Sequence, residues 1–219
     1  MSKRDLFVVV ADLDAENTIK TLLVDRQPAL GINLAFSPER PPNGDLLRWK
    51  GRDSGCHKDA IDLLRRPQCT HRHGLLIFDH HGCGAERKSR VDVERDLEVN
   101  LHANGWAVGD VAVIVIEPEL EAWVWSSSPR VADLLGWQDD RDRLRPFLAE
   151  ANLWSAESLK PIDPKKAMAT ALKEKQKPLG ARLFSDLASR VAVAQCQDAA
   201  FRKFNETLKR WFGGHGESA

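Results

Sequence analysis

The chain has 219 residues, of which 42% are hydrophobic and 29% are charged, and its formal net charge at pH 7 is zero. This composition fits a soluble globular protein with one main core, and it excludes a wholly disordered chain. No apolar run approaches the roughly 20 residues of a membrane span, and the N-terminus does not have the pattern of a signal peptide, so we expect no membrane partner.

Short apolar runs predict the strands of a parallel sheet. In chain order they are residues 6–11, 31–36, 74–78 and 111–116, with a further short strand at 46–49 inside a loop rich in proline, glycine and charge. Apolar residues at helical spacing predict helices at 15–23, 58–66, 85–104, 118–124, 131–135, 142–149, 164–175, 181–193 and 198–211. This alternation predicts an α/β fold with a mainly parallel sheet flanked by helices.

The charge is unevenly distributed along the chain. Residues 158–212 hold 12 Lys and Arg against 5 Asp and Glu, whereas residues 1–157 hold 20 against 26. We therefore place the α/β core at residues 1–128 and expect a basic helical C-terminal region, residues 129–219, packed on it. Such a region suits contact with phosphates, although a set of basic helices facing water explains the same counts.

Three predicted strands are followed directly by an acidic residue, namely Asp12, Asp79 and Glu117. In open parallel sheets the ligand site lies outside the carboxyl ends of the strands, so these carboxylates are expected to converge. Converging carboxylates repel one another unless a cation such as Mg²⁺ or Mn²⁺ neutralises them. We predict a metal site here, with Glu16 and Glu121 as additional acids one helical turn further along. The alternative is that each acid stabilises the N-terminus of the next helix.

Three segments carry a resemblance to Toprim-like proteins, which include OLD-family nucleases. They are residues 8–16 (VVVADLDAE), 75–84 (LLIFDHHGCG) and 116–123 (IEPELEAW). The family pattern has an acid after the first strand, an Asp-x-Asp after a later strand and an acid near a third. The resemblance implies a Toprim-like sheet and a metal-dependent nuclease or phosphodiesterase activity.

Over nearly its whole length the chain resembles, more closely, a family of small proteins from the methylation-associated antiphage defence systems of bacteria. The matching stretches are residues 117–128, 134–137, 160–161, 164–168 and 210–212. This resemblance implies a role in defence, with other defence-system proteins as partners, and it implies no particular reaction.

The chain departs from the Toprim pattern at two motifs. Asp12 and Leu13 stand where the family has Glu-Gly, and His81 stands where Asp-x-Asp has its second acid. Histidine ligates Mn²⁺ or Zn²⁺ but is a poor ligand for Mg²⁺. His81 would alternatively act as a general acid or base, or be an ordinary loop residue.

Four lysines at the start of the basic region are candidates for contact with the backbone of a nucleic acid, most simply DNA. They are Lys160, Lys165, Lys166 and Lys173. Phosphate contacts of this kind give binding that depends on salt and not on sequence. The alternative is a lysine-rich helix face in water.

The cysteines support weaker alternatives. Cys56 and His57, combined with Cys69, His71 and His73, would form a zinc site of unusual spacing. Cys83 in a Gly-Cys-Gly turn would be a nucleophile. No disulfide pattern is present, which favours a reducing cytoplasm.

Aromatic residues exclude one mechanism and predict one contact. The chain contains no tyrosine, so a covalent tyrosine mechanism of the topoisomerase type is excluded. We expect several tryptophans to fill the seam between the sheet and the helical region. They are Trp123, Trp125, Trp137, Trp154 and Trp211.

These observations favour a nuclease or phosphodiesterase that depends on Mg²⁺ or Mn²⁺ and acts on nucleic acid in antiphage defence. The first alternative is a subunit without catalytic activity that docks partner proteins or DNA. The second is a protein that binds a nucleotide or another phosphorylated small ligand at the same strand ends.

Overall fold

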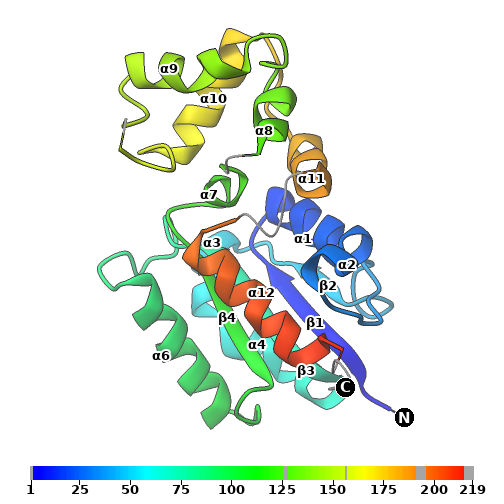
Figure 1. Ribbon diagram of the computed structural model, residues 1–219. Coiled ribbons are helices and arrows are strands. Elements are labelled where there is room, and N and C mark those ends of the chain that lie inside the picture. Colours follow the sequence, from blue (N-terminus) through cyan, green and yellow to red (C-terminus); the bar gives the residue numbers. More distant parts are fainter. Residues whose placement is uncertain (1, 126–127, 156, 191–195, 215–219) are drawn as a thin grey trace, which may run out of the picture.

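The computed structural model describes residues 2–125, 128–155, 157–190 and 196–214. Its centre is a four-stranded sheet in which every strand pair is parallel, in the order β2-β1-β3-β4 (Figure 1). The strands are β1 (Arg4–Val10), β2 (Leu46–Arg48), β3 (His71–Asp79) and β4 (Val111–Ile116). The predicted α/β fold with a parallel sheet is therefore confirmed.

Helices surround the sheet on both faces and at one end. In chain order they are α1 (Leu13–Asp25), α2 (Gln27–Leu30), α3 (Arg52–Lys58), α4 (Ala60–Arg65), α5 (Pro67–Thr70), α6 (Arg90–Ala103), α7 (Glu121–Val124), α8 (Pro129–Leu134), α9 (Arg141–Glu150), α10 (Pro164–Glu174), α11 (Ala181–Arg190) and α12 (Ala199–Phe212). Among the described residues, none of these helices has the length and apolarity that a bilayer crossing requires.

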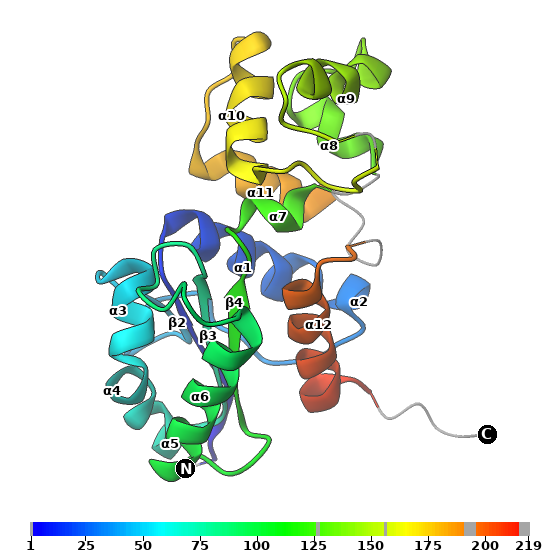
Figure 2. The ribbon, with the colours of Figure 1, turned by 90° about the vertical axis from the view of Figure 1, so that its left-hand side faces the viewer.

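The apolar run of β1 contributes to two separate cores because its side chains alternate between the faces of the sheet. Leu6, Val8 and Val10 pack on the face covered by α1 and α12. Phe7 and Val9 pack on the opposite face, against residues of α3, α4 and α6. Figure 2 shows these two layers of helices on either side of the sheet. Burial on both faces explains why a continuous apolar run is read correctly as a strand.

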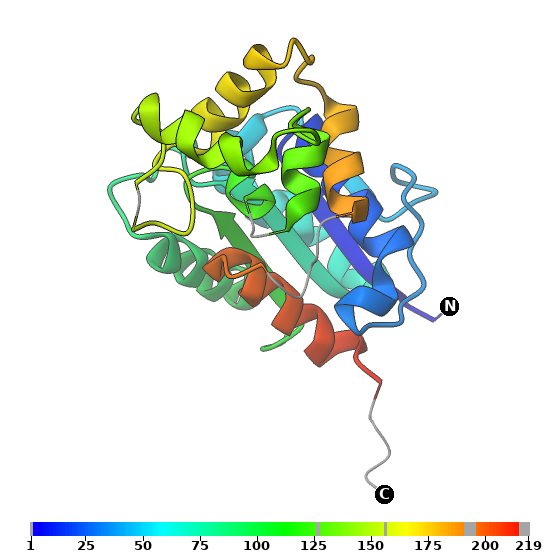
Figure 3. The same ribbon diagram turned by 45° about the horizontal axis from the view of Figure 1, so that its top comes forward.

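The C-terminal half divides into two parts with different positions. Helices α8, α9 and α10 form a helical cluster beyond the carboxyl ends of the strands, which Figures 1 and 3 show at the top of the molecule. Helix α11 returns to pack on α1, and α12 packs on β4. The predicted C-terminal helices are present within the described residues, which do not include 191–193 of the helix predicted at 181–193. Among these described helices, it is α12 that packs on the sheet.

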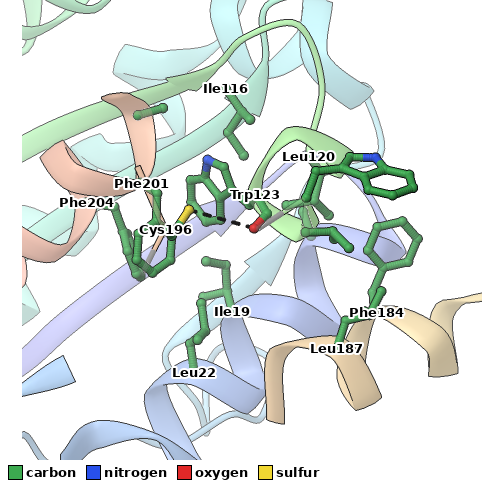
Figure 4. Packing of buried hydrophobic residues seen from close by; sticks show 14 of the residues in the cluster. Ile19, Leu22, Ile116, Leu120, Trp123, Phe184, Leu187, Cys196, Phe201 and Phe204 are labelled. Atoms are coloured by element: carbon green, nitrogen blue, oxygen red, sulfur yellow. Dashed lines mark hydrogen bonds between the residues drawn. The ribbon is translucent and has the colours of Figure 1, made fainter. Parts of the chain in front are cut away.

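Of the five tryptophans expected in the seam between the sheet and the helical region, Trp123 and Trp211 lie there, and Trp211 stacks on His73 of β3 with 4.5 Å between ring centres. The Trp123 ring lies 5.1 Å from that of Phe201 and 5.5 Å from that of Phe204, both on α12 (Figure 4). Trp125 and Trp137 are each only 2% exposed. Trp125, Trp137 and Trp154 lie instead in the helical cluster, where Trp125 contacts Trp154 and Trp137 contacts Phe147 of α9. The buried Trp123 ring stabilises the join between the sheet and α12.

The strand predicted at residues 31–36 is wrong. Ile32 and Leu34 are each 7% exposed, which explains the alternating pattern. However, the Leu34 N–H donates to the side chain of Gln27, and the Asn33 N–H donates to the Phe212 carbonyl. The segment is extended because a side chain and the end of α12 supply its hydrogen bonds in place of a neighbouring strand.

Strand β4 lies at an edge of the sheet, and side chains from two helices cover that edge. The Glu94 carboxylate accepts from the Val115 N–H at 2.9 Å, and Glu98 accepts from the Val113 N–H at 2.9 Å. Lys203 donates to the Val113 carbonyl at 2.9 Å and to Glu98 at 2.7 Å. These contacts take the place of a fifth strand.

Candidate functional site

The strand order places a candidate site between β1 and β3. The chain runs from β1 outward to β2 and then crosses to β3 on the other side of β1, which makes this gap the topological switch point of the sheet. Ligands of open α/β sheets bind at the carboxyl end of such a point. Asp12 follows β1 and Asp79 ends β3, so both flank it.

A cleft of about 590 Å³ opens at this end of the sheet. Its walls come from the segment after β1, the connection after β2, the end of β3, the segment after β4 and the start of α10. The lining residues are Ala11, Asp12, Leu13, Asp14, Arg48, Trp49, Lys50, Arg52, Asp53, Asp79, His81, Glu119 and Lys165.

Local structure holds two of the acids in place. Asp12 is the N-cap of α1, and its carboxylate accepts from the Ala15 N–H at 2.8 Å. Asp53, in the first turn of α3, accepts from the Asp79 N–H at 2.8 Å. An ionised carboxylate has about four acceptor positions, so each of these groups retains capacity for another partner.

The electrostatic state of Asp79 is the most unusual feature of the cleft. Burial of its carboxyl group raises its pKa well above the ordinary value, and the charges of Asp53, Asp12 and Glu121 raise this pKa further. A hydrogen bond from the Leu120 backbone opposes the shift without cancelling it. Strongly shifted groups in a cleft are typical of functional sites, because folding alone does not favour such an arrangement.

The neighbouring acids show the same effect. Burial raises the pKa of Asp53, Asp14 and Glu121, and the charge of Asp12 adds to the increase for Asp53 and Asp14. Lys165 is the cation that opposes all three shifts. The floor of the cleft therefore favours the approach of a positive charge.

Cations line the wall of the same cleft. Burial lowers the pKa of Lys165, but its hydrogen bond to Glu119 at 3.1 Å and the charges of Glu121, Glu119 and Asp79 outweigh this effect, so the net pKa is raised. Lys50 and Arg52 also face the cleft and make no ion pair within the described part of the chain.

The chain was compared with protein families, with curated proteins and with solved structures. No family, curated protein or solved structure matches it. The chemistry of the cleft is therefore inferred from its own side chains.

The structure does not bring Glu117 to the cleft. Strand β4 ends at Ile116, which pairs with Asp79, and the next residue of an extended chain points to the other side. Accordingly, the Glu117 carboxylate lies 3.7 Å from His80 Nδ1, and 57% of its side chain is exposed. From this segment it is Glu121, 5% exposed, that acts on Asp79.

The other predicted acid and the histidine occupy the margin of the cleft. Glu16 lies outside the lining and pairs with Arg48, which does line it, at 3.0 Å. His81 lines the cleft with 73% of its side chain exposed, and its Nδ1 lies 3.2 Å from Glu119 Oε1. The Glu119 carboxylate therefore contacts both His81 and Lys165.

Of the four predicted lysines, only Lys165 lines the cleft. Lys160 donates to the Ala122 carbonyl at 2.8 Å and pairs with Asp198 at 2.9 Å, which makes it a link between α7 and α12. Lys166 and Lys173 are exposed on α10, away from the cleft lining. The tertiary position of α10 decides which of its lysines faces the acids.

The donor types suit a hard divalent cation, since Asp12, Asp53 and Asp79 offer carboxylate oxygens that repel one another. Within the described ranges, no group of three or more His, Cys, Asp or Glu side chains is already arranged to hold a metal ion. This finding also covers the cysteines and histidines considered for zinc.

Six charged groups of the cleft are absent from the predicted site residues, namely Asp14, Arg48, Lys50, Arg52, Asp53 and Glu119. Lys50, Arg52 and Asp53 follow β2, which confirms the short strand predicted at 46–49, but the sequence pattern predicts no site residue after that strand. The rule that ligand sites lie after parallel strands finds them as soon as β2 is counted as a strand of the sheet.

Proposed function

We propose that the cleft is the active site of a divalent-metal-dependent phosphodiesterase that cleaves DNA, Toprim-like in its acids, within a bacterial antiphage defence system. The observation that carries the proposal is that Asp12, Asp53 and Asp79 meet at the switch point of the sheet, where burial and the charges of the other two acids raise the pKa of Asp79. The defence context rests on the motif resemblance alone.

Each group of the cleft has a role in this proposal. Asp12, Asp53 and Asp79 would hold Mg²⁺ or Mn²⁺, which supplies charge stabilisation for a phosphoryl group when bound. Lys50 and Arg52 bind the phosphate oxygens, and the planar Arg52 guanidinium is suited to do so through two hydrogen bonds.

In this proposal His81 transfers protons, and Lys165 balances negative charge, at the wall opposite Lys50 and Arg52. Glu119 orients His81 through its Nδ1, which leaves Nε2 to act as a general acid or base towards the leaving or attacking oxygen. Lys165 holds the same Glu119 from the other side and limits the negative charge of the site. Without a divalent cation, the carboxylates would repel a phosphodiester.

The test is cleavage of linear and supercoiled DNA by the full chain with Mg²⁺ or Mn²⁺. We expect Asp53→Asn and Asp79→Asn to abolish cleavage, because each removes one ligand charge, while both variants stay folded. The matched control is Asp62→Asn, which changes an acid that is 77% exposed and pairs with Arg65 outside the cleft. Absence of metal-dependent cleavage by the wild type, or full activity in Asp79→Asn, would refute the proposal.

A specific observation favours a second candidate, a subunit of the defence complex without catalytic activity. The described residues hold no arranged metal group, and Glu119 is already engaged by both His81 and Lys165. This candidate predicts that an Asp53→Asn/Asp79→Asn double variant gives full phage protection and still co-purifies with other system components. Loss of protection by the folded double variant would exclude it.

A further inference from the structure

A second cavity, of about 380 Å³, lies in the helical cluster, on the side of α7 away from the acids. Its volume falls within the range of pockets that hold small organic ligands. Its aromatic and charged lining residues are Trp125, Arg141, Asp142, Arg145, Trp154 and Lys160.

The aromatic wall of this pocket is fixed before any ligand arrives. The Trp154 Nε1–H and the Arg145 guanidinium both donate to the Ser158 carbonyl, at 2.9 and 2.8 Å. The guanidinium carbon of Arg145 lies 5.2 Å from the Trp154 ring centre. Trp125 meets Trp154 edge-on, with 5.4 Å between ring centres. Because these side chains are already ordered, binding of a planar aromatic ligand would cost little side-chain entropy in the protein.

The charges of the pocket favour an anionic group at its rim, but only moderately. Arg141 already pairs with Asp133 at 3.0 Å, and Lys160 pairs with Asp198 at 2.9 Å. Arg145 provides a third cation, held by a carbonyl group. Trp154, which is half-buried, therefore offers the ring surface for recognition, and the buried Trp125 supports it from the side. Among the described lining residues, the cations outnumber the one acid, Asp142, and so select for a ligand with negative charge.

The pocket and the cleft share two segments of chain as their common wall. The Trp125 Nε1–H donates to the Pro164 carbonyl at 2.9 Å, and the next residue, Lys165, lines the cleft. Lys160 Nζ donates at 2.8 Å to the carbonyl of Ala122, which directly follows Glu121. Among the described residues, the segments that line the pocket at Trp125 and Lys160 are therefore continuous with those that carry Glu121 and Lys165 towards the acids.

We propose that this pocket binds a nucleobase, with its phosphate at the cationic rim, from the same strand whose phosphodiester enters the cleft. The identity of that strand rests on the proposed function, whereas affinity for a free nucleotide does not require cleavage. Base stacking on aromatic and guanidinium groups tolerates every base, so the pocket would hold a strand without reading its sequence.

The first experiment measures binding by the full chain without divalent cation, in EDTA. Deoxyadenosine monophosphate is titrated by calorimetry, and deoxyribose 5-phosphate serves as the ligand without a base. We expect saturable binding of the nucleotide and binding of the sugar phosphate at least about tenfold weaker, because stacking is lost. No saturable nucleotide binding at millimolar concentration, or equal binding of both ligands, overturns the inference.

The second experiment locates the site. We expect Arg145→Ala to weaken nucleotide binding about tenfold and Trp154→Leu to weaken it at least as much. Arg143→Ala is the matched control, since Arg143 lies on the same helix, pairs with Glu150 at 3.0 Å and does not line the pocket. Equal effects of Arg143→Ala and Arg145→Ala overturn the inference. Arg145→Ala decides the matter if Trp154→Leu does not fold.

Cleavage assays separate this inference from the proposed function. Nucleotide binding that Arg145→Ala weakens, in a chain that cleaves no DNA, supports the pocket and refutes the nuclease. DNA cleavage by a chain that binds no mononucleotide refutes the pocket and supports the nuclease.

Discussion

The two ends of the sheet hold a buried carboxylate in opposite ways. At the amino end, Asp45 is 3% exposed and accepts from Arg4, from His71 Nε2 at 3.0 Å and from the Ser37 N–H at 2.7 Å. At the carboxyl end, Asp79 faces other carboxylates, and its pKa is raised well above the ordinary value. One acid is fully satisfied by the fold, and the other is not.

This difference in partners means that Asp45 stabilises the fold, whereas Asp79 destabilises it. Burial and the charge of Arg4 lower the pKa of His71 to about 4, so the ring is neutral at pH 7 and donates one N–H to Asp45. Removing a buried carboxylate that has this set of partners destabilises the fold, because its partners are left without an acceptor. A set of repelling charges costs stability and is explained by a ligand that relieves it.

The largest expected effect is at the amino end. Asp45→Ala leaves Arg4 and His71 without their shared acceptor, and we expect a loss of about 3–5 kcal/mol in the free energy of unfolding. Urea denaturation measures it. Asp62→Ala, which removes an exposed ion pair, should change stability by less than about 0.5 kcal/mol. A similarly small loss for Asp45→Ala would remove the contrast between the two ends.

At the carboxyl end, the expected change in the free energy of unfolding has the opposite sign. Asp79→Asn keeps the shape of the side chain and removes one repelling charge, so we expect a gain of about 1–2 kcal/mol at pH 7 in EDTA. Thermal unfolding should show this as a rise in Tm of a few degrees. A lower Tm for Asp79→Asn than for the wild type would contradict the electrostatic interpretation of the cleft.

Cation binding sharpens the same contrast. Mn²⁺ at ten times its Kd should stabilise the wild type by about 1.4 kcal/mol through binding to the folded state alone. We expect Asp79→Asn to lose this stabilisation, whereas Asp62→Asn retains it. Equal thermal shifts in wild type and Asp79→Asn would place any bound Mn²⁺ outside the cleft.

The smallest expected effect is the pH dependence of the Asp79→Asn gain. Because the folded-state pKa of Asp79 is raised above 3.8, the folded protein binds this proton more readily than the unfolded chain does. The gain is therefore full above the folded-state pKa and is lost as the pH falls through that pKa towards 3.8.

Histidine titration does not disturb this comparison. The lowered pKa of His71 costs stability as the pH falls from 6.5 towards about 4, which is the opposite direction, but it acts equally on wild type and Asp79→Asn. The difference between the two denaturation curves at each pH isolates Asp79. A gain that grows as the pH falls would be inconsistent with a raised pKa.

Much of the fold is predictable from the sequence because three of the strands are buried on both faces. Continuous apolar runs such as those of β3 and β4 have few alternatives in a parallel sheet. The runs of β1 and β3 end next to Asp12 and Asp79, so the strand-end rule finds two acids of the cleft. Site residues that directly follow a long buried strand can therefore be predicted from the sequence pattern.

The rest depends on three-dimensional facts that local patterns do not contain. Asp53 lies five residues beyond the end of β2, and the short run at 46–49 predicts a strand without showing that this strand joins the parallel sheet. Glu117 directly follows β4, as predicted, but its side chain points away from the cleft, towards His80. Lys165 is distinguished from the neighbouring Lys166 only by how α10 meets the segment that contains Glu119.

The covered edge of β4 has a consequence for assembly. Any additional strand, from another copy or from a partner, would have to displace Glu94 and Glu98 from main-chain N–H groups and Lys203 from a carbonyl. Exposed strand edges are where proteins recruit foreign chains or aggregate, and charged side chains discourage both. This side of the sheet is therefore closed to strand addition, and whatever joins the protein there must dock on helices.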